Sequence, residues 1–287
     1  MTTDRQTIVD WLKLEDATEL FARADEVRRT IAGDVLHVRG LIEISNFCRC
    51  DCAYCGLRAS NTSLTRYRIP DEEIVEIARK AAGIGFKTIV MQSGEDPHFS
   101  GKRVTELVRA IKATGGAITL SLGEWSDEEY ADWYKAGADR YLLKHETMDQ
   151  ELYRRLHPNL SFENRLRCQR VLQEIGYQVG SGCMVGLPGQ TIESIADDII
   201  YCRDFGFDMA GFGPFRTHPG TPLAGSPDGD NFLALKVLAA ARIALRETHL
   251  PATTSLVVAD TSMREKALHA GANVIMPDIT PAKYSLL

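Results

Sequence analysis

The sequence predicts an α/β fold in which parallel strands close into a (β/α)8 TIM barrel, preceded by a helical N-terminal extension. From residue 41 onward, short apolar runs alternate with amphipathic segments, which yields eight candidate strands and seven helical crossovers. Such alternation indicates parallel strands with right-handed crossovers, and eight regular units favour closure over an open doubly wound sheet. Segments rich in Gly, Cys and charged residues follow the candidate strands, where barrels place their chemistry.

The individual elements follow from local patterns. The candidate strands are short apolar runs. They span residues 41–44, 88–91, 117–120, 141–143, 178–185, 209–212, 253–258 and 273–276. The predicted helices span residues 71–82, 104–113, 127–135, 150–156, 162–174, 192–203 and 233–246, with a short helix between the last two strands. Pro70 suits the start of the first of these helices, and Ser126 is the expected N-cap of the third.

Composition bounds the class of protein. The 287 residues are 44% hydrophobic and 25% charged, which excludes disordered, collagen-like and disulfide-scaffold classes. A net charge of −6 argues against a general nucleic-acid or anionic-membrane surface. No apolar run of about 18 residues is present, and residues 1–10 lack the apolar core of a signal peptide. We therefore expect a cytoplasmic protein with no nucleic-acid or membrane partner. From the pattern of strands and helices, we expect residues 1–38 to form the helical extension and residues 39–287 to form the barrel domain.

Four of the seven cysteines lie within eight residues, directly after the first candidate strand. In a reducing compartment such a cluster more often binds metal than forms disulfides. Cys48, Cys52 and Cys55 have the spacing C-x3-C-x2-C, so three thiolates on a short loop can hold three corners of an iron–sulfur cube and leave the fourth iron open. Zinc bound through Cys50, Cys52 and Cys55, or through all four cysteines, is the alternative, although no second CxxC pair or nearby HxxxH completes such a site.

The remaining cysteines are interpreted differently. Cys50 is a spectator that could substitute as a ligand. Cys168, Cys183 and Cys202 lie in candidate helices or a strand, where a thiol usually fills the core.

The cysteine motif, with Tyr54 directly before its last cysteine, resembles the signature of the radical S-adenosylmethionine (radical SAM) superfamily. The resemblance implies a 4Fe-4S cluster with one open iron, which binds S-adenosylmethionine (SAM) and cleaves it to methionine and a 5′-deoxyadenosyl radical. It also implies that Tyr54 lies at the SAM site. Two further motifs, residues 92–97 and 186–191, also resemble elements of the superfamily. Taken singly, each of them would fit an ordinary turn as well.

The first of these motifs follows the second candidate strand. Gln92, Ser93, Gly94 and Glu95 are similar to the superfamily's Gly-Gly-Glu element, which receives the SAM amino group. The second motif, residues 186–191, is similar to the fifth-strand element whose backbone flanks adenine. Within this motif, the resemblance implies that Leu187 lies at the SAM site.

Longer segments resemble one group within the superfamily, the HydE maturases of FeFe-hydrogenase. They are residues 43–48, 54–58, 91–97, 121–125, 145–147, 161–165, 184–191 and 213–215. The resemblance implies that Glu146 and Arg165 contact SAM, because a carboxylate suits ribose hydroxyls and a guanidinium suits a carboxylate. It implies further that substrate-binding residues line the barrel cavity, although each one singly fits ordinary strand packing. They are Thr119, Ser121, Lys144, Met209, Thr253, Thr254 and Met276.

Three features depart from the HydE pattern. Lys144 stands where an arginine is expected, so the charge is kept but the planar two-pronged geometry is lost. Cys50 adds a thiol to the motif. The sequence ends at Leu287, whereas some HydE members continue into a tail that carries a second cluster.

The resemblance also implies a function, with no catalytic residue assigned beyond those that hold the cluster and SAM. The implied role is to help build the dithiomethylamine-bridged di-iron centre of FeFe-hydrogenase. The implied substrate is a small iron complex, a cysteine-bound iron carbonyl cyanide, whose sulfur the deoxyadenosyl radical attacks. Implied partners are other hydrogenase maturation proteins and an external electron donor. The alternatives are a methylornithine-synthase-like or biotin-synthase-like radical SAM enzyme and, from another class, a non-catalytic iron–sulfur assembly scaffold.

Overall fold

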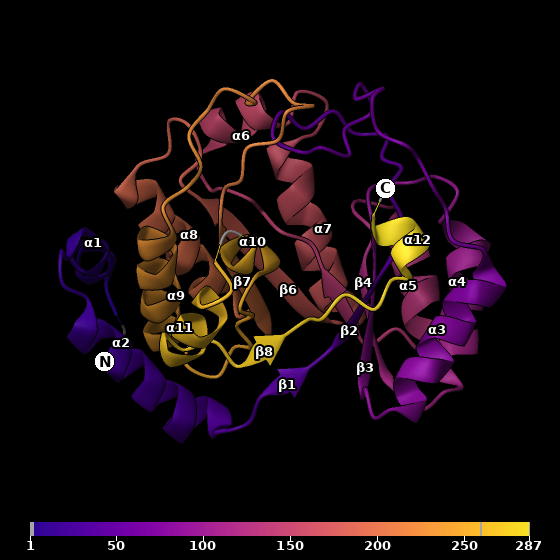
Figure 1. Cartoon of the computed structure of the whole chain (residues 1–287), viewed down its shortest axis with the longest axis horizontal. Coiled ribbons are helices and arrows are strands. Elements are labelled where there is room, and N and C mark those ends of the chain that lie inside the picture. The colour runs from indigo at the N-terminus through magenta and orange to yellow at the C-terminus, as the bar shows by residue number, and fades with distance from the viewer. Residues whose placement is uncertain (1–2, 259, 287) are drawn as a thin grey trace.

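The protein is described here by a computed structural model that covers residues 3–258 and 260–286. Six parallel strands form one sheet in chain order (Figure 1). They are β2 (Gly40–Ser45), β3 (Thr88–Ser93), β4 (Ala117–Ser121), β5 (Arg140–Leu142), β6 (Gln178–Val185) and β7 (Met209–Pro214). A second, two-stranded parallel sheet pairs β1 (His37–Val38) with β8 (Val274–Ile275). Seven of the eight predicted strands are therefore confirmed.

Bridges outside the named strands link the two sheets. Met209 of β7 pairs with His249, and Pro251 pairs with Val274 of β8. On the other side of β8, the N–H of Leu41 donates to the carbonyl of Pro277 at 3.0 Å. Parallel backbone pairing thus runs from β2 through β7 and β8 back to β2, as the predicted barrel requires.

The predicted strand at 253–258 is wrong. The chain pairs with β7 and β8 earlier, through residues 249–251, and then forms the short helix α10 (Thr254–Val257). The run is rich in β-branched residues, which favour strands, but Val258 is 74% exposed and would bury little in a sheet. Tertiary context therefore overrides local propensity at this position.

The predicted helices form between the strands. They are α3 (Asp71–Gly83), α4 (Gly101–Lys112), α5 (Asp127–Ala136), α6 (Gln150–Leu156), α7 (Phe162–Ile175), α8 (Ile192–Phe205), α9 (Asn231–Leu245) and α11 (Met263–His269), with α12 (Ala282–Ser285) near the end. Pro70 precedes α3 as expected. Ser126 caps α5 in a capping box with Glu129, which satisfies free N–H groups of the first turn.

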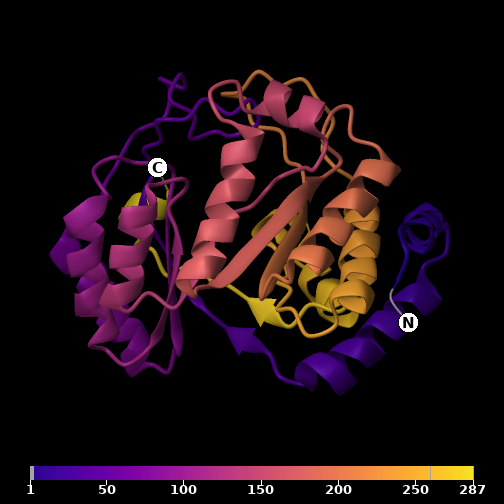
Figure 2. The ribbon, with the colours of Figure 1, turned by 180° about the vertical axis from the view of Figure 1, so that it is seen from behind.

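The N-terminal segment is mainly helical, as expected. It contains α1 (Arg5–Lys13), α2 (Thr18–Val27) and the π-helical turn η1 (Arg28–Gly33). Figure 2 shows these helices outside α8 and α9, on the side away from α3 and α4. Because α9 lies between this layer and the strands, its residues are nearly all buried, which explains its apolar sequence. The proposed boundary after residue 38 falls directly after β1, which already belongs to the β1–β8 pair.

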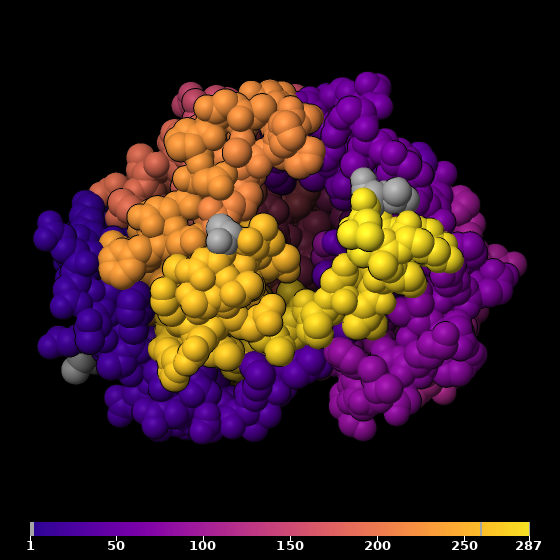
Figure 3. All heavy atoms as spheres, viewed as in Figure 1, coloured from indigo at the N-terminus to yellow at the C-terminus, as the bar shows by residue number. Residues whose placement is uncertain are grey.

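The space-filling view shows where the molecule is hollowed. A depression opens between the orange part of the chain, which follows β7, and the yellow C-terminal part (Figure 3). No helix in the described part of the chain is long and apolar enough to cross a membrane.

Candidate functional site

A cavity of about 480 Å³ lies where β2, β3, β4 and β5 end. This is the edge at which parallel α/β folds place their chemistry. The cavity brings together most of the residues that the sequence nominated. They are Cys48, Cys52, Tyr54, Cys55, Gln92, Ser93, Gly94, Glu95, Ser121, Lys144, Glu146 and Arg165.

The other nominated residues do not line this cavity. Leu187 is buried in a small apolar cluster that also contains Tyr54. Thr119 is buried, and its hydroxyl has no hydrogen-bond partner. Met209 lies at the start of β7, where its sulfur accepts a hydrogen bond from Arg39 at 2.8 Å.

The last three nominated residues belong to the C-terminal part of the ring. Thr253 lies against Gly213, Thr254 is exposed, and Met276 directly follows β8. Their placement at a substrate remains a prediction.

Arg66 holds the shape of the cysteine loop. Its guanidinium donates to four backbone carbonyls of the loop, those of Asn46, Leu57, Arg58 and Asn61. Such a clamp satisfies loop carbonyls that would otherwise need water. The loop therefore has a defined conformation built by the protein's own side chains.

A second arginine fixes the start of this loop. Arg68 donates to both carboxylate oxygens of Asp96, at 2.7 and 2.8 Å, and its guanidinium lies 3.8 Å from the ring centre of Phe47. Ser45 donates to Asp96 at 2.6 Å and accepts from the N–H of Phe47 at 3.0 Å. Burial of Asp96 opposes its charge, but Arg68 and Ser45 outweigh that effect and lower its pKa. The residue before Cys48 is thereby oriented on two sides.

Two glycines allow the loops after β3 and β4 to approach closely. A Cβ on Gly94 would lie 2.5 Å from the Cβ of Cys48 and 2.5 Å from the carbonyl of Phe47. Gly123 has φ of +89°, and a Cβ there would overlap the side chain of Glu95. Only glycine fits these contacts without moving the cysteine loop.

Glu95 joins the loops rather than facing open space. Its carboxylate accepts from the N–H of Glu124 at 2.8 Å and from Arg49, within the cysteine motif, at 3.1 Å. Arg49 also donates to the carbonyl of Glu124 at 3.0 Å, and its guanidinium lies over Trp125. The expected motif after β3 therefore has a structural partner in the loop after β4.

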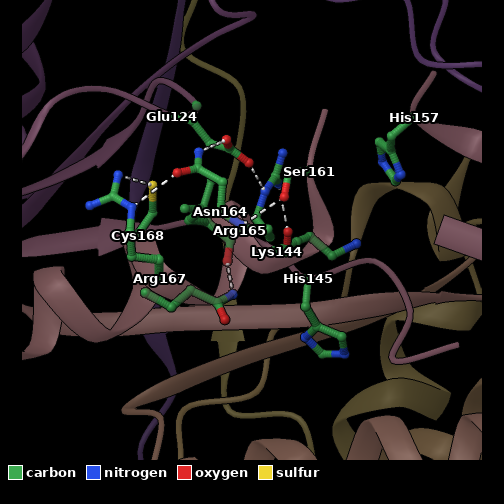
Figure 4. Close-up of polar contacts among 12 residues, drawn as sticks. Glu124, Lys144, His145, His157, Ser161, Asn164, Arg165, Arg167 and Cys168 are labelled. Carbon is green, nitrogen blue, oxygen red and sulfur yellow. Dashed lines mark hydrogen bonds and ion pairs between the residues drawn. The ribbon is translucent and has the colours of Figure 1, made fainter. Parts of the chain in front are cut away.

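Arg165 belongs to the same network, at the first turn of α7. Its Nε donates to Glu124 at 2.5 Å, and its Nη1 donates to the carbonyl of Lys144 at 2.7 Å (Figure 4). Asn164 donates to the other oxygen of Glu124. Burial of Arg165 opposes its charge, but Tyr153 and Glu124 outweigh that effect and raise its pKa. Within the described residues Nη2 has no hydrogen-bond partner, so it is available to a ligand in the cavity.

Tyr54 is anchored from outside the cavity by α6. Its hydroxyl lies 3.0 Å from Nε2 of His157, and Nδ1 of the same ring lies 3.0 Å from the carbonyl of Tyr153. Since Nδ1 must donate to that carbonyl, Nε2 accepts from Tyr54. Burial lowers the pKa of His157 to about 4, which keeps the ring neutral. The N–H of Ala53 also donates to the carbonyl of Leu156, so α6 holds the second half of the cysteine motif at two points.

Glu146 has an unusual backbone conformation. It is one of two non-glycine residues in the described chain with positive φ, at 67°. Such conformations cost energy and cluster at functional sites. Its buried Oε2 lies 3.1 Å from Nζ of Lys144 in an ion pair that lacks hydrogen-bond geometry. Burial alone would raise the pKa of Glu146, but the positive charges of Lys144 and Arg165 lower it, so a charged carboxylate lines the cavity.

The thiols suit an iron–sulfur cluster. Thiolates are preferred ligands of iron in such clusters. Burial raises the pKa of Cys52 to about 12, and a bound cation would offset that cost. Three thiols, the carboxylate of Glu146 in the same cavity and the close approach at Gly94 therefore fit a cluster with a small ligand beside it. In residues 3–258 and 260–286, no three His, Cys, Asp or Glu side chains gather around one point that a single ion could occupy.

The other cysteines are placed as expected. Cys168, Cys183 and Cys202 are buried in the core. Cys50 is buried, and its N–H donates to the sulfur of Cys48 at 3.4 Å. Its role as a spectator remains a prediction.

Several residues that shape the site were not nominated from the sequence. Arg66 and Arg68 act from an irregular segment before α3, and His157 lies just after α6. No motif identifies them: Arg68 and His157 act on residues 28 and 103 positions away, and Arg66 acts on backbone carbonyls 5 to 20 positions away, which no side-chain pattern marks. Glu124 could have been nominated from the sequence, because it lies inside the segment 121–125 that resembles HydE.

Comparisons with known proteins identify the family of the chain. The profile of the radical SAM superfamily matches residues 42–202. The [FeFe] hydrogenase maturase subunit HydE of Thermotoga maritima is 50% identical over 286 residues, which cover 99% of this chain and 82% of the relative. A 3-methylornithine synthase of Methanosarcina acetivorans is 31% identical over 264 residues, covering 91% of this chain and 74% of that protein.

Solved structures and further relatives extend the match. The crystal structure of the methylornithine synthase PylB superposes with a TM-score of 0.91 at 29% identity, covering 98% of this chain and 84% of that one. A biotin synthase of Cutibacterium acnes is a more distant relative, 30% identical over 74% of this chain and 60% of its own length.

Proposed function

The chain belongs to the radical SAM superfamily and is a radical SAM enzyme, and on that premise we propose that it is a HydE-type maturase of FeFe-hydrogenase. One observation carries the proposal. Three thiols in C-x3-C-x2-C order, Glu146 and Arg165 line a single cavity at the carboxyl ends of the strands. The identity to HydE over nearly the whole chain supports the maturase assignment above the alternatives.

Cys48, Cys52 and Cys55 would hold a 4Fe-4S cluster with one open iron. When bound, this cluster supplies the electron that cleaves SAM to methionine and a 5′-deoxyadenosyl radical. The protein's own contribution is to hold the thiols ready. Arg66 and the Arg68–Asp96 pair do so from the protein side.

The cavity offers complementary groups for each end of SAM. The backbone and side chains of Gln92, Ser93, Gly94 and Glu95 would receive the amino group. The free Nη2 of Arg165 would bind the carboxylate in a charge-assisted hydrogen bond. Glu146 would accept from the ribose hydroxyls, with Tyr54 and the backbone at Leu187 beside the adenosine.

The substrate would bind deeper in the barrel. A cysteine-bound iron carbonyl cyanide complex is anionic, and Lys144 places an ammonium group in the cavity with Ser121 as a hydroxyl donor. Thr119, Met209, Thr253, Thr254 and Met276 are proposed to approach it from the remaining strands. Walls that exclude water protect a radical and hold reacting atoms close together. Other hydrogenase maturation proteins and an external electron donor are the proposed partners.

The proposal is tested on anaerobically reconstituted protein that is reduced with dithionite and given SAM. The synthetic cysteine–iron carbonyl cyanide complex is added to one of two samples. We expect a new substrate-dependent EPR signal of iron and a deoxyadenosyl adduct at sulfur, detected by mass spectrometry. The Cys52→Ser variant is the matched control and should give neither signal.

Other outcomes lead to the alternatives. SAM cleavage that ignores the complex would remove the maturase assignment and favour a methylornithine-type or biotin-type substrate. The PylB superposition makes the methylornithine type the second candidate. An intact cluster without SAM cleavage would favour an assembly scaffold.

A further inference from the structure

A chain of buried polar groups lies behind the wall of the cavity and takes no part in the contacts proposed above. Tyr201 of α8 donates to Gln169 of α7 at 2.6 Å. Gln169 donates to the carbonyl of Leu143 at 2.6 Å and to Ser181 of β6 at 2.9 Å. The oxygen of Ser181 lies 2.8 Å from Nδ1 of His145. Burying polar groups is costly unless they are hydrogen-bonded, and a satisfied buried network favours one particular arrangement.

His145 and Asp198 end this chain. Both side chains are fully buried, and Nε2 of His145 lies 3.4 Å from Oδ1 of Asp198 without a hydrogen bond. Oδ1 of Asp198 is engaged elsewhere, because it accepts from the N–H of Met148 at 2.6 Å. Figure 4 shows the imidazole of His145 pointing away from Lys144 and Arg165, so it does not reach toward the cavity side of the segment.

These contacts fix the backbone on both sides of Glu146. Before it, the N–H of His145 donates to Ser181 at 3.2 Å. After it, Met148 is held by Asp198. Glu146 itself donates to the carbonyl of Gly182 at 3.1 Å and is forced to φ of 67° between the two anchors. A non-glycine residue keeps such a conformation only when its surroundings over-determine it.

We propose that His145 and Asp198 are positioning residues that impose the left-handed backbone conformation of Glu146 and so direct its carboxylate into the cofactor cavity. The proposal rests on the proposed function only for the identity of the ligand that this carboxylate meets. Asp198 acts through Met148, and His145 acts through Ser181. Neither side chain lines the cavity.

The first test uses the protein without cofactor and is therefore independent of the proposed function. Glu146→Gly and Glu146→Ala both remove the carboxylate, but only glycine relieves a positive φ. In the otherwise unchanged protein we expect the glycine variant to unfold about 2 °C or more above the alanine variant. Adding Asp198→Ala should abolish this difference, because the segment is then free to relax to negative φ.

Matched variants make the test specific. Asp198→Asn keeps an acceptor for the N–H of Met148 and should retain the difference. Asp197→Ala removes the neighbouring carboxylate, which pairs with Arg5 at the surface, and should retain it too. Ser181→Ala is a milder second variant, because it removes both contacts to His145. It should reduce the difference in unfolding temperature between the glycine and alanine variants, and it replaces Asp198→Ala in the test if that variant does not fold. A glycine–alanine difference that persists in Asp198→Ala, or in Ser181→Ala if only that variant folds, would overturn the proposal.

The second test measures SAM binding to the reconstituted protein by equilibrium titration. We expect Asp198→Ala to lower the affinity at least about tenfold while the absorbance of the cluster is unchanged, and Asp198→Asn to restore most of it. Unchanged affinity in Asp198→Ala would contradict the positioning role. If neither the parent protein nor any variant binds SAM, while the difference in unfolding temperature between Glu146→Gly and Glu146→Ala behaves as expected, the proposed function fails and the backbone role of His145 and Asp198 stands.

Discussion

The arc of the ring from β2 to β6 and the arc from residue 249 to residue 279 are built differently. The first consists of strands with continuous pairing and loops that are tied together by side chains, such as Arg66, Glu95 and Glu124. The second consists of isolated bridges and the two-residue strand β8, with α10 between them. Nearly all the nominated cofactor residues lie in the first arc and reach the cavity. Thr253, Thr254 and Met276, nominated for substrate, lie in the second and do not.

This difference has a physical basis. A cluster and SAM demand a fixed set of donors on contiguous motifs, and those loops are preorganised by charge-assisted hydrogen bonds. The second arc is held by side chains from outside it, such as Arg216 on the carbonyl of Ser255 and Arg242 on that of Gly271. In the cofactor half of the site, by contrast, the loops are tied to one another.

In the first arc, substitutions of the motif cysteines should have the largest effect on cluster binding and SAM cleavage. Cys48→Ala, Cys52→Ala or Cys55→Ala should abolish the cluster and SAM cleavage, because a thiolate ligand is lost. Cys50→Ala should keep both. The measurement is iron content and visible absorbance after anaerobic reconstitution, with Cys202→Ala as the core control. Loss of the cluster in Cys50→Ala and its retention in Cys48→Ala would show that the ligand assignment is wrong.

Gly94→Ala should be the next most damaging change. Its Cβ would press on Cys48 and on the carbonyl of Phe47, so the loop must shift, at a cost of about 1–3 kcal/mol in the free energy of unfolding. We expect most of the bound iron to be lost on reconstitution. Gly83→Ala, at the end of α3, meets open space and should be neutral. Equal iron content in the two variants would mean that cluster binding does not depend on the close approach of Gly94 to the cysteine loop.

The two arcs can also be compared by pH. His157 of the first arc and His249 of the second both have a pKa of about 4, chiefly because of burial, against an ordinary value of 6.5. Protonation then favours the unfolded chain, so their contribution to stability is complete above about pH 6.5 and is lost as the pH falls to 4.

For His157 this loss amounts to roughly 3 kcal/mol. His157→Gln should shrink the difference in unfolding free energy between pH 7 and pH 4 by that amount, measured by denaturant titration. His249→Gln should also shrink it, but only His157→Gln should alter the EPR spectrum of the cluster, through Tyr54. An unchanged pH dependence in His157→Gln would contradict the neutral buried ring.

Arg165→Ala should weaken SAM binding about 10- to 100-fold, since hydrogen bonds between charged groups contribute about 1.5–3 kcal/mol. The cluster spectrum should be unchanged. Arg170→Ala, five residues further along α7, removes an exposed arginine side chain and should leave the affinity as it is. Equal affinities of the two variants for SAM would remove Arg165 from the site.

The smallest effects are expected at the substrate. Ser121→Ala should raise the KM for the iron complex a few-fold, because it removes one neutral hydrogen bond worth about 1 kcal/mol. Thr254→Ala should leave KM unchanged, since its side chain is exposed and outside the cavity. A larger effect at Thr254 than at Ser121 would indicate that the second arc closes over the substrate.

Much of the fold could be predicted because local patterns agree with the tertiary structure. The helix α5, for example, is specified by its apolar spacing together with the capping box of Ser126 and Glu129, which lie three residues apart. Residues 253–258 show the limit of such reasoning. Their β-branched side chains favour a strand, yet residues 249–251 already fill the place between β7 and β8.

The candidate site divides in the same way. The spacing of Cys48, Cys52 and Cys55 could be recognised because all three ligands stand on one short loop. The contacts of His157 with Tyr54 and of Asp198 with Met148 could not, because each joins residues that are at least 50 positions apart.

The amino-acid sequence alone was sufficient for the alternation of strands and helices and for the identity of the cofactor motifs, since both depend on spacings of a few residues. Closure of the ring through β8 depended on the assembled fold, as did the pairing of Arg68 with Asp96 and the left-handed conformation of Glu146. Each of these arises where distant segments meet and a buried polar group must find a partner or a backbone must give way, and no short-range pattern records such a contact.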